Sequence, residues 1–177
     1  ASALQALYGQ ARTAADDDTK LRLHRDGIAR ARARLAATPD DPAGLLWLAA
    51  HLGAEALVRG KLVALKVLPE MERLLMRLDE VAPTYEAAAA SRVLGRLYQK
   101  APAVISIGSS KKARIRYEKA LRLAPDHPGN LAFAADFFDG EGETDRARSL
   151  ARRCKAVLAG GGTWPAHDLE EWKGIID

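Results

Sequence analysis

The sequence has 177 residues, of which 48% are hydrophobic and 28% charged, with a formal net charge of +4. This balance fits a folded domain of ordinary size and argues against a disordered chain. One cysteine cannot form an intramolecular disulfide, and no run of about 18 apolar residues is present that could span a membrane.

Helical signals fill the chain and strand signals are almost absent. Apolar residues recur at helical spacing, capping residues such as Asp16, Asp41 and Ser109 precede these stretches, and Gly60 and Gly160 follow them. Pro69 is expected to kink or break its helix near Leu68. The pattern predicts an all-α fold with helices, in chain order, over 3–14, 18–36, 42–59, 61–80, 84–100, 110–123, 127–138, 143–158 and 166–175.

Small residues recur at a spacing of 34 positions, aligning Ala113 with Ala147 and Ala120 with Cys154. Small side chains let two antiparallel helices approach closely, and Tyr117 can wedge beside the crossing point. With Leu94, Gly95 and Tyr98 in the preceding helix, the pattern resembles that of tetratricopeptide (TPR) repeats. The resemblance implies an α-solenoid of antiparallel helical hairpins built from divergent TPR-like repeats.

We expect one TPR-like helical domain over residues 1–177. The repeat array is expected over 15–159 and a C-terminal capping segment over 160–177. In that segment Trp164 and Trp172 would cover the open apolar edge of the last hairpin.

A narrower resemblance covers roughly residues 25–160. It is carried by 92–98 (RVLGRLY), by the loop with Ala101–Pro102 and 106–108 (SIG), by 112–114 (KAR) and 117–121 (YEKAL), and by 124–126 (APD). These motifs are similar to the TatT component of bacterial TRAP transporters. The resemblance implies a periplasmic, often lipid-anchored helical scaffold that binds the transporter's substrate-binding protein and has a ligand-accommodating channel. Ala1 is not a lipobox cysteine, so membrane attachment would require a lipid anchor upstream.

No catalytic or cofactor site is expected. The four histidines share no metal-ligand spacing, and Cys154 occupies a repeat position that favours a small buried residue over a nucleophile. Asp16–Asp18 are interpreted as capping residues rather than a cation site. The segment 106–112 lacks phosphate-loop spacing and is interpreted as a capped loop. The arginines between 22 and 34 do not share one helix face, which argues against nucleic-acid binding.

In a TPR array the first helix of each hairpin lines a concave groove. Carried onto this sequence, that frame predicts a partner- or ligand-binding surface formed by Leu46, Ala50, Arg92, Arg96, Gln99, Asp136 and Asp139. The alternative is structural, with Arg92 or Arg96 forming a salt bridge to Asp136 between adjacent hairpins. Such a bridge contributes little stability when it is exposed.

The sequence therefore indicates a non-catalytic scaffold that docks a protein partner. The first hypothesis is the periplasmic component of a TRAP-type uptake system that docks a solute-binding protein, with a small ligand as a further candidate. The alternative is a cytoplasmic TPR adaptor that binds a peptide or a partner protein in its concave groove. An enzyme with a helical fold is disfavoured, because no nucleophile, base and orienting group occur at a recognisable spacing.

Overall fold

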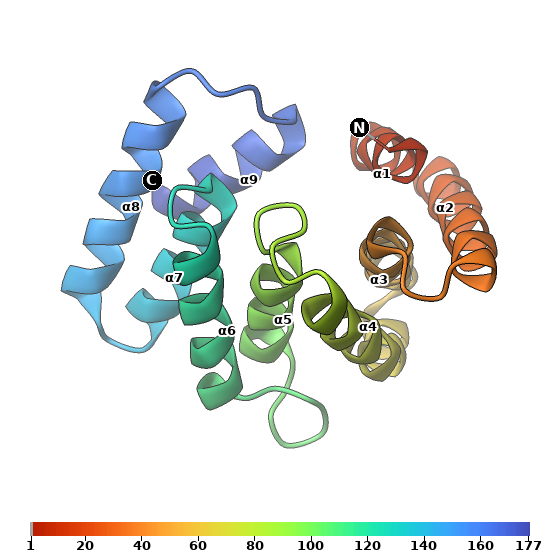
Figure 1. Ribbon diagram of the computed structural model, residues 1–177, viewed down its shortest axis with the longest axis horizontal. Coiled ribbons are helices and arrows are strands. Elements are labelled where there is room, and N and C mark those ends of the chain that lie inside the picture. The colour runs from red at the N-terminus through yellow and green to blue at the C-terminus, as the bar shows by residue number, and fades with distance from the viewer. Residues whose placement is uncertain (1) are drawn as a thin grey trace. The chain divides into compact units, whose positions relative to one another are not determined.

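The computed structural model describes residues 2–177; Ala1, the position considered for a lipobox cysteine, lies outside them. The described residues form α-helices and no β-strand, which confirms the all-α fold class (Figure 1). Two compact units are distinguished, one comprising residues up to Pro83 with 101–107, the other 84–100 with 108–177. The single-domain organisation and the solenoid arrangement stay predictions. The helices are α1 (Ala3–Thr13), α2 (Asp17–Ala37), α3 (Pro42–Arg59), α4 (Lys61–Val81), α5 (Ala89–Lys100), α6 (Ser110–Leu123), α7 (Pro128–Gly140), α8 (Thr144–Ala159) and α9 (Ala166–Ile176).

In the first unit, α3 packs between α2 and α4, and α1 packs on α2 and α3. The predicted caps form: an Asp16 carboxylate oxygen accepts from the Thr19 N–H at 2.8 Å, and Asp41 accepts from the Gly44 N–H at 2.6 Å. Of the two effects expected of Pro69, the break near Leu68 is wrong, because α4 continues through this residue, and the kink stays a prediction. Packing along α4 outweighs the lost hydrogen bond, since its apolar face is buried at Met71, Leu74, Leu75 and Leu78.

A buried histidine pair links α2 and α3. The Nδ1 atoms of His24 and His51 lie 3.0 Å apart, and Nε2 of His51 lies 3.1 Å from the carbonyl oxygen of Leu4. A carbonyl only accepts, so His51 carries its proton on Nε2 and His24 donates from Nδ1. The ring of Tyr8 contacts both imidazoles. His51 is therefore a hydrogen-bonded core residue.

The histidine pair predicts a loss of stability in acid. Burial, and secondarily the proximity of His51, lowers the pKa of His24 to about 4, although Glu55 opposes the shift. Burial also lowers the pKa of His51. Because the unfolded histidines bind protons near pH 6.5 and the folded ones only at lower pH, stability is full above pH 6.5 and falls as the pH drops toward 4. His24 alone should cost about 2 kcal/mol between pH 7 and pH 5.

Urea unfolding at pH 7.5 and pH 5.0 measures this loss. The variant His24→Gln keeps a neutral hydrogen-bonding side chain at the site, so its stability should change less between the two pH values. Equal stability of the native sequence at both pH values would contradict the assignment of neutral, buried histidines.

In the second unit, α5 packs on α6 and α7, α6 on α7, and α7 on α8. The small residues at the 34-residue spacing, Ala113, Ala120, Ala147 and Cys154, are all buried. The ring of Tyr117 is also buried and lies so close to Gly95 that a Cβ there would meet its atoms at 2.8 Å. Glycine at position 95 thus allows α5 and α6 to approach each other closely.

The C-terminal segment packs on two helices of the second unit. α9 lies against α7 and α8, and a Cβ at Gly129 would meet the ring of the buried Trp172 at 3.1 Å. The His127 ring meets the rings of both Trp164 and Trp172 edge-on. Burial, and secondarily the charge of Arg92, lowers the pKa of His127 to about 3. We propose, in line with the sequence, that 160–177 acts as a capping segment.

The helix expected from residue 84 begins five residues later, at Ala89. Residues 84–88 form a turn in which three successive non-glycine residues, Glu86, Ala87 and Ala88, have φ values of 46°, 54° and 62°. Each such left-handed residue costs roughly 1–2 kcal/mol. Contacts from other elements must therefore hold this turn in place.

Candidate functional site

A polar cluster joins α5 to α7. Arg96, Gln99 and Lys100 lie three or four positions apart on α5, so they share one helix face, and all three contact Asp136 on α7. Arg96 donates to an Asp136 carboxylate oxygen, Gln99 donates to the same oxygen at 2.9 Å, and the Lys100 ammonium lies 3.1 Å from it. The structure thus brings together three of the predicted site residues, Arg96, Gln99 and Asp136.

This α5–α7 cluster is held rigidly yet reaches solvent. The Tyr117 hydroxyl donates to Gln99 at 2.6 Å, and the Arg96 guanidinium lies over the Phe133 ring, 4.9 Å from its centroid. The side chains of Arg96 and Asp136 are 28% and 32% exposed. Burial alone would raise the pKa of Asp136, but hydrogen bonds from Arg96, Lys100 and Gln99 outweigh it and hold this pKa below the usual range. The cluster therefore presents a fixed, ionised ion pair at the surface.

Arg92 has a different role from Arg96. Its guanidinium donates to the Asn130 side-chain oxygen at 2.9 Å and to the carbonyl oxygen of Ala87 at 3.0 Å. The alternative pairing of Arg92 with Asp136 is therefore wrong; the pairing of Arg96 with Asp136 is the one that forms. Burial lowers the pKa of Arg92 to about 10, despite the charges of Asp168 and Glu86, so it remains a cation at neutral pH. Arg92 anchors the left-handed turn.

Asn130 completes this anchor from α7. It is fully buried, and its amide nitrogen donates to the carbonyl oxygens of Ala87, Ala120 and Ala124 at 3.1, 3.2 and 2.9 Å. Asn130 thereby joins the turn to the C-terminal end of α6. Sequence reasoning missed it, because nothing in its spacing separates it from its helical neighbours.

The remaining predicted site residues lie elsewhere. Asp139 is exposed near the C-terminal end of α7, and within the described part of the chain no side-chain hydrogen bond or ion pair joins it to the α5–α7 cluster. Leu46 and Ala50 belong to α3 in the first unit, where Leu46 is buried and Ala50 half-buried. Sequence reasoning also missed Lys100 and Tyr117. Lys100 could have been found from its spacing of four from Arg96 on a helix.

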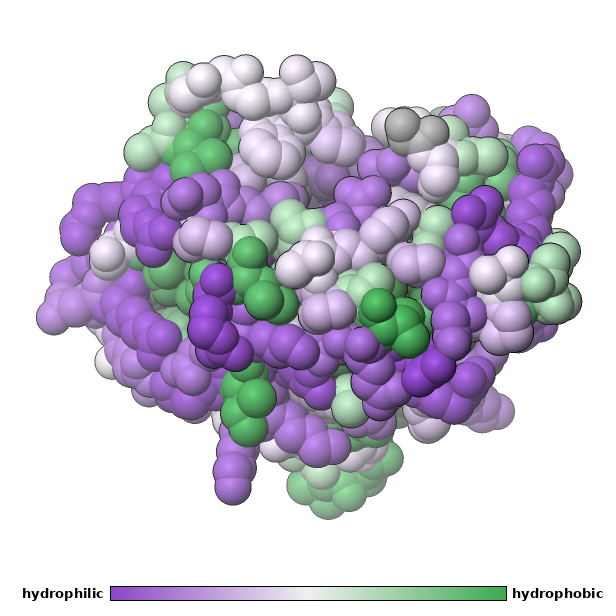
Figure 2. Space-filling model, viewed as in Figure 1, coloured by the Kyte–Doolittle hydropathy of each residue, from purple (hydrophilic) through white to green (hydrophobic). Residues whose placement is uncertain are grey.

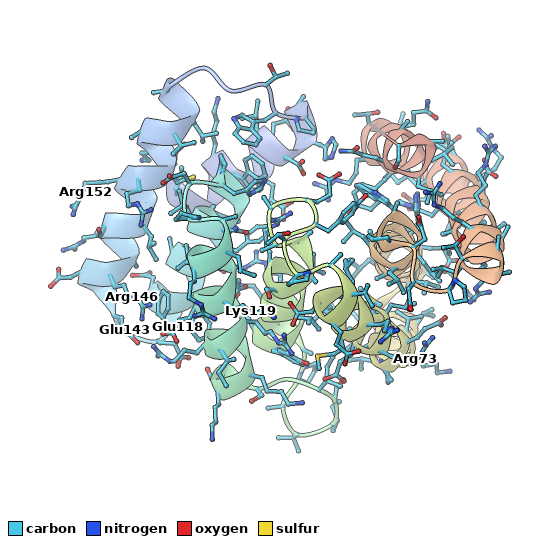
Figure 3. All side chains as sticks on the ribbon, viewed as in Figure 1. Arg73, Glu118, Lys119, Glu143, Arg146 and Arg152 are labelled. Atoms are coloured by element: carbon cyan, nitrogen blue, oxygen red, sulfur yellow. The ribbon has the colours of Figure 1, made fainter. Side chains whose placement is uncertain are left out.

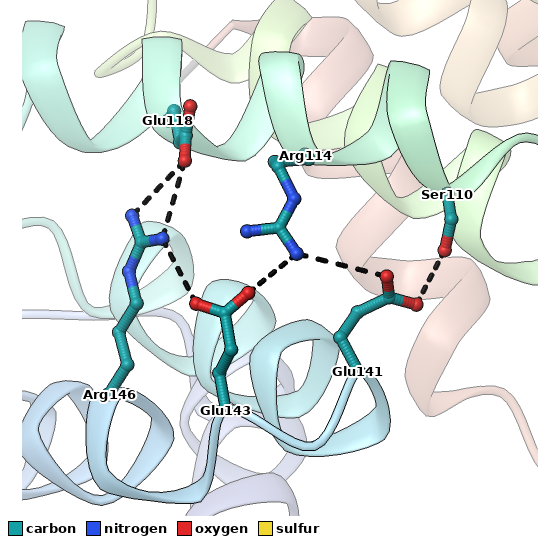
Figure 4. Close-up of polar contacts among 6 residues, drawn as sticks. All are labelled: Ser110, Arg114, Glu118, Glu141, Glu143 and Arg146. Carbon is teal, nitrogen blue, oxygen red and sulfur yellow. Dashed lines mark hydrogen bonds and ion pairs between the residues drawn. The ribbon is translucent and has the colours of Figure 1, made fainter.

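A second polar network, the charge ladder, links α6 to α7 and α8 (Figure 4). Arg114 contacts Glu143 at 2.6 Å, and Arg146 bridges Glu118 and Glu143 at 3.3 and 3.4 Å. Glu141 extends the ladder by accepting from the Ser110 hydroxyl at 2.5 Å. The Arg146 guanidinium also lies over the Phe138 ring, 3.6 Å from its centroid. Cations and acids alternate along the ladder, so its charges are largely satisfied within the chain.

Neither network resembles a metal or nucleophilic site. Within residues 2–177, no group of three or more His, Cys, Asp or Glu side chains is placed to hold a metal ion. Burial raises the pKa of the Cys154 thiol to about 11, and its sulfur donates to the Pro128 carbonyl oxygen. A thiol of this kind is inert. In the same part of the chain no helix has both the length and the apolar character needed to cross a membrane.

Packed helices with a charged, partly exposed face place the chain in the class of all-helical proteins. The comparison with known families narrows this class. The family model of the TRAP transporter T-component (TAtT) matches residues 3–138, and the chain belongs to this family. This finding confirms the resemblance seen in the sequence and assigns the chain to a transporter-component family. No curated protein matches the chain.

Proposed function

We propose that the chain is the non-catalytic, periplasmic scaffold of a TRAP-type uptake system and docks that system's substrate-binding protein. Family membership supports a place among the components of such a transporter. It also favours this function over a cytoplasmic adaptor unrelated to transport. The single observation that carries the docking proposal is the α5–α7 cluster, because it offers charged, hydrogen-bonded and partly exposed side chains on two packed helices.

The character of the surface supports a polar docking site. In the view of Figure 2 hydrophilic residues cover most of the visible face, and apolar residues form separate small patches. The strongly exposed large apolar side chains are scattered among α3, α4, α6 and the loop between α5 and α6. Recognition through charge and hydrogen bonds is therefore favoured over a broad apolar interface.

Arg96, Gln99 and Asp136 are proposed as the centre of the docking surface, with Asp139 at its periphery. The side chains of Arg96 and Asp136 are partly exposed, so Arg96 can donate and Asp136 can accept further hydrogen bonds from a partner. Arg92 contributes indirectly, because it holds the turn that precedes α5. Leu46 and Ala50 stay proposed as contact residues of the first unit, where the half-buried Ala50 offers the more accessible side chain.

Reversal of the Arg96–Asp136 pair tests the proposal. The double variant Arg96→Asp, Asp136→Arg keeps one ion pair between α5 and α7 but exchanges the positions of the two charges. The exchange places a second cation beside Lys100 and removes the acceptor of Gln99, so we expect a modest fall in the thermal unfolding temperature with the fold retained. Its affinity for the purified substrate-binding protein of the same transporter should fall by about tenfold or more, because like charges then face each other across the interface.

The charge ladder supplies the matched control. The double variant Glu118→Arg, Arg146→Glu exchanges an ion pair in the same unit, outside the proposed surface, and should bind the substrate-binding protein as the native chain does. Isothermal titration calorimetry measures the affinity of both double variants for the substrate-binding protein. Native affinity in the Arg96→Asp, Asp136→Arg variant would refute docking at this cluster.

A further inference from the structure

The first unit contains a cleft that the proposed docking function does not use. It has a volume of about 660 Å³, and its lining comes from α2, the turn after it, α3 and α4. The floor includes the buried side chains of Leu45, Leu48 and Leu74, and charged side chains form the rim. Concave sites with an apolar floor, a few polar groups and volumes of roughly 300–1,000 Å³ are typical of small-molecule binding.

The rim carries three arginines and three acids, and five of these six side chains pair with one another. Arg77 donates to both carboxylate oxygens of Asp40, at 2.7 and 2.6 Å, and contacts Glu80 at 3.1 Å. These bonds hold the pKa of Asp40 below its usual range. A second pair on the rim is formed by Arg32, which lies 3.6 Å from Glu70.

Arg73 is the exception among the rim charges. It is exposed on α4, where Figure 3 labels it, and among the described residues it has no hydrogen bond or ion pair. An anion that reaches this guanidinium therefore displaces no existing pair. Arginine is well suited to carboxylate, because its planar donors match the two oxygens.

Charge balance limits such a ligand to one negative charge. Arg32 with Glu70 is neutral, and Arg77 with Asp40 and Glu80 carries a net charge of −1, so Arg73 makes the rim neutral overall. One bound carboxylate already leaves the occupied cleft with a net charge of −1. A second carboxylate would meet the acids of the rim without a free cation.

We infer that this cleft binds a monocarboxylate with an apolar body, which places its carboxylate on Arg73 and its hydrocarbon on Leu45, Leu48 and Leu74. The site is independent of the α5–α7 cluster. Its loss would leave docking of the substrate-binding protein unchanged.

Three six-carbon probes separate charge from apolar contact: hexanoate, the neutral hexanamide and the dianion adipate. Titrations followed by methyl NMR should show hexanoate shifting the signals of Leu45, Leu48 and Leu74. Hexanamide and adipate should each bind about tenfold more weakly than hexanoate. In Arg73→Gln the affinity for hexanoate should fall about tenfold, to that of hexanamide, because the charge-assisted hydrogen bonds are lost.

Arg152→Gln is the matched control. Arg152 is likewise exposed on a helix, in the other unit and labelled in Figure 3, and its replacement should leave hexanoate affinity unchanged. Far-UV circular dichroism verifies that both variants fold. Equal binding of hexanoate and hexanamide, equal losses in both variants, or shifts at the cleft caused only by an acidic peptide would each overturn the inference.

Discussion

Replacing Gly27 with alanine is expected to lower the free energy of unfolding by about 2–3 kcal/mol. Gly27 lies on α2 directly against the His51 imidazole, where a Cβ would stand 2.4 Å from ring atoms. The ring cannot move aside cheaply, because its two nitrogens are bonded to His24 and to the Leu4 carbonyl oxygen. The cost of overpacking exceeds the gain of about 1 kcal/mol that alanine brings to a helix interior.

Gly53→Ala is the control for this prediction. Its Cβ would meet the terminal methyl carbon of Met71 at 2.6 Å, and that flexible side chain can shift at little cost. Urea unfolding should show native or higher stability for Gly53→Ala. In a His51→Ala background, Gly27→Ala should cost little, because the obstructing ring is absent. A full loss in that background would refute the steric explanation.

Replacing Asn130 with leucine is expected to cost about 3 kcal/mol or more. The substitution keeps a similar side-chain volume but removes the donor shared by three carbonyl oxygens and the acceptor of Arg92. Buried groups left without partners cost about 1–3 kcal/mol each. The left-handed turn at 86–88 also loses one of its two anchors, so its backbone strain is no longer opposed.

Asp139→Ala on the same helix is the comparison, since an exposed substitution usually changes stability by no more than about 0.5 kcal/mol. Thermal unfolding, followed by circular dichroism, compares the stabilities of the Asn130→Leu and Asp139→Ala variants. Hydrogen exchange should in addition show faster exchange near residues 86–89 in Asn130→Leu. Native protection there would mean that Arg92 alone is enough to hold the turn.

Most helix positions could be predicted because local signals and tertiary packing agree. Asp16, Asp41 and Ser109 cap the helices that they were expected to cap. The turn at 84–88 could not be predicted, since its alanines favour helix and no glycine or proline lies within 84–88. Its conformation depends on Asn130, which is 43 positions away from Ala87. Local helix propensity cannot reveal a contact between two residues so far apart in the sequence.

The candidate site, like the fold, could be predicted only in part. The repeat frame placed Arg96, Gln99 and Asp136 on facing helices, and the structure brings them into contact. The same frame treated Arg92 as equivalent to Arg96, which is one helical turn further along. Only the three-dimensional position of the turn decides that Arg92 reaches inward to carbonyl oxygens instead. The cleft around Arg73 has no sequence signature, because its lining comes from three separate helices and the turn after α2.

The rate at which the buried Cys154 thiol is alkylated reports how often the second unit opens. It is the one cysteine of the sequence, and it is fully enclosed between α8 and the start of α7. An alkylating reagent can reach the sulfur only when these two helices separate. The rate of iodoacetamide labelling therefore counts separation events, and it does so without any engineered reporter.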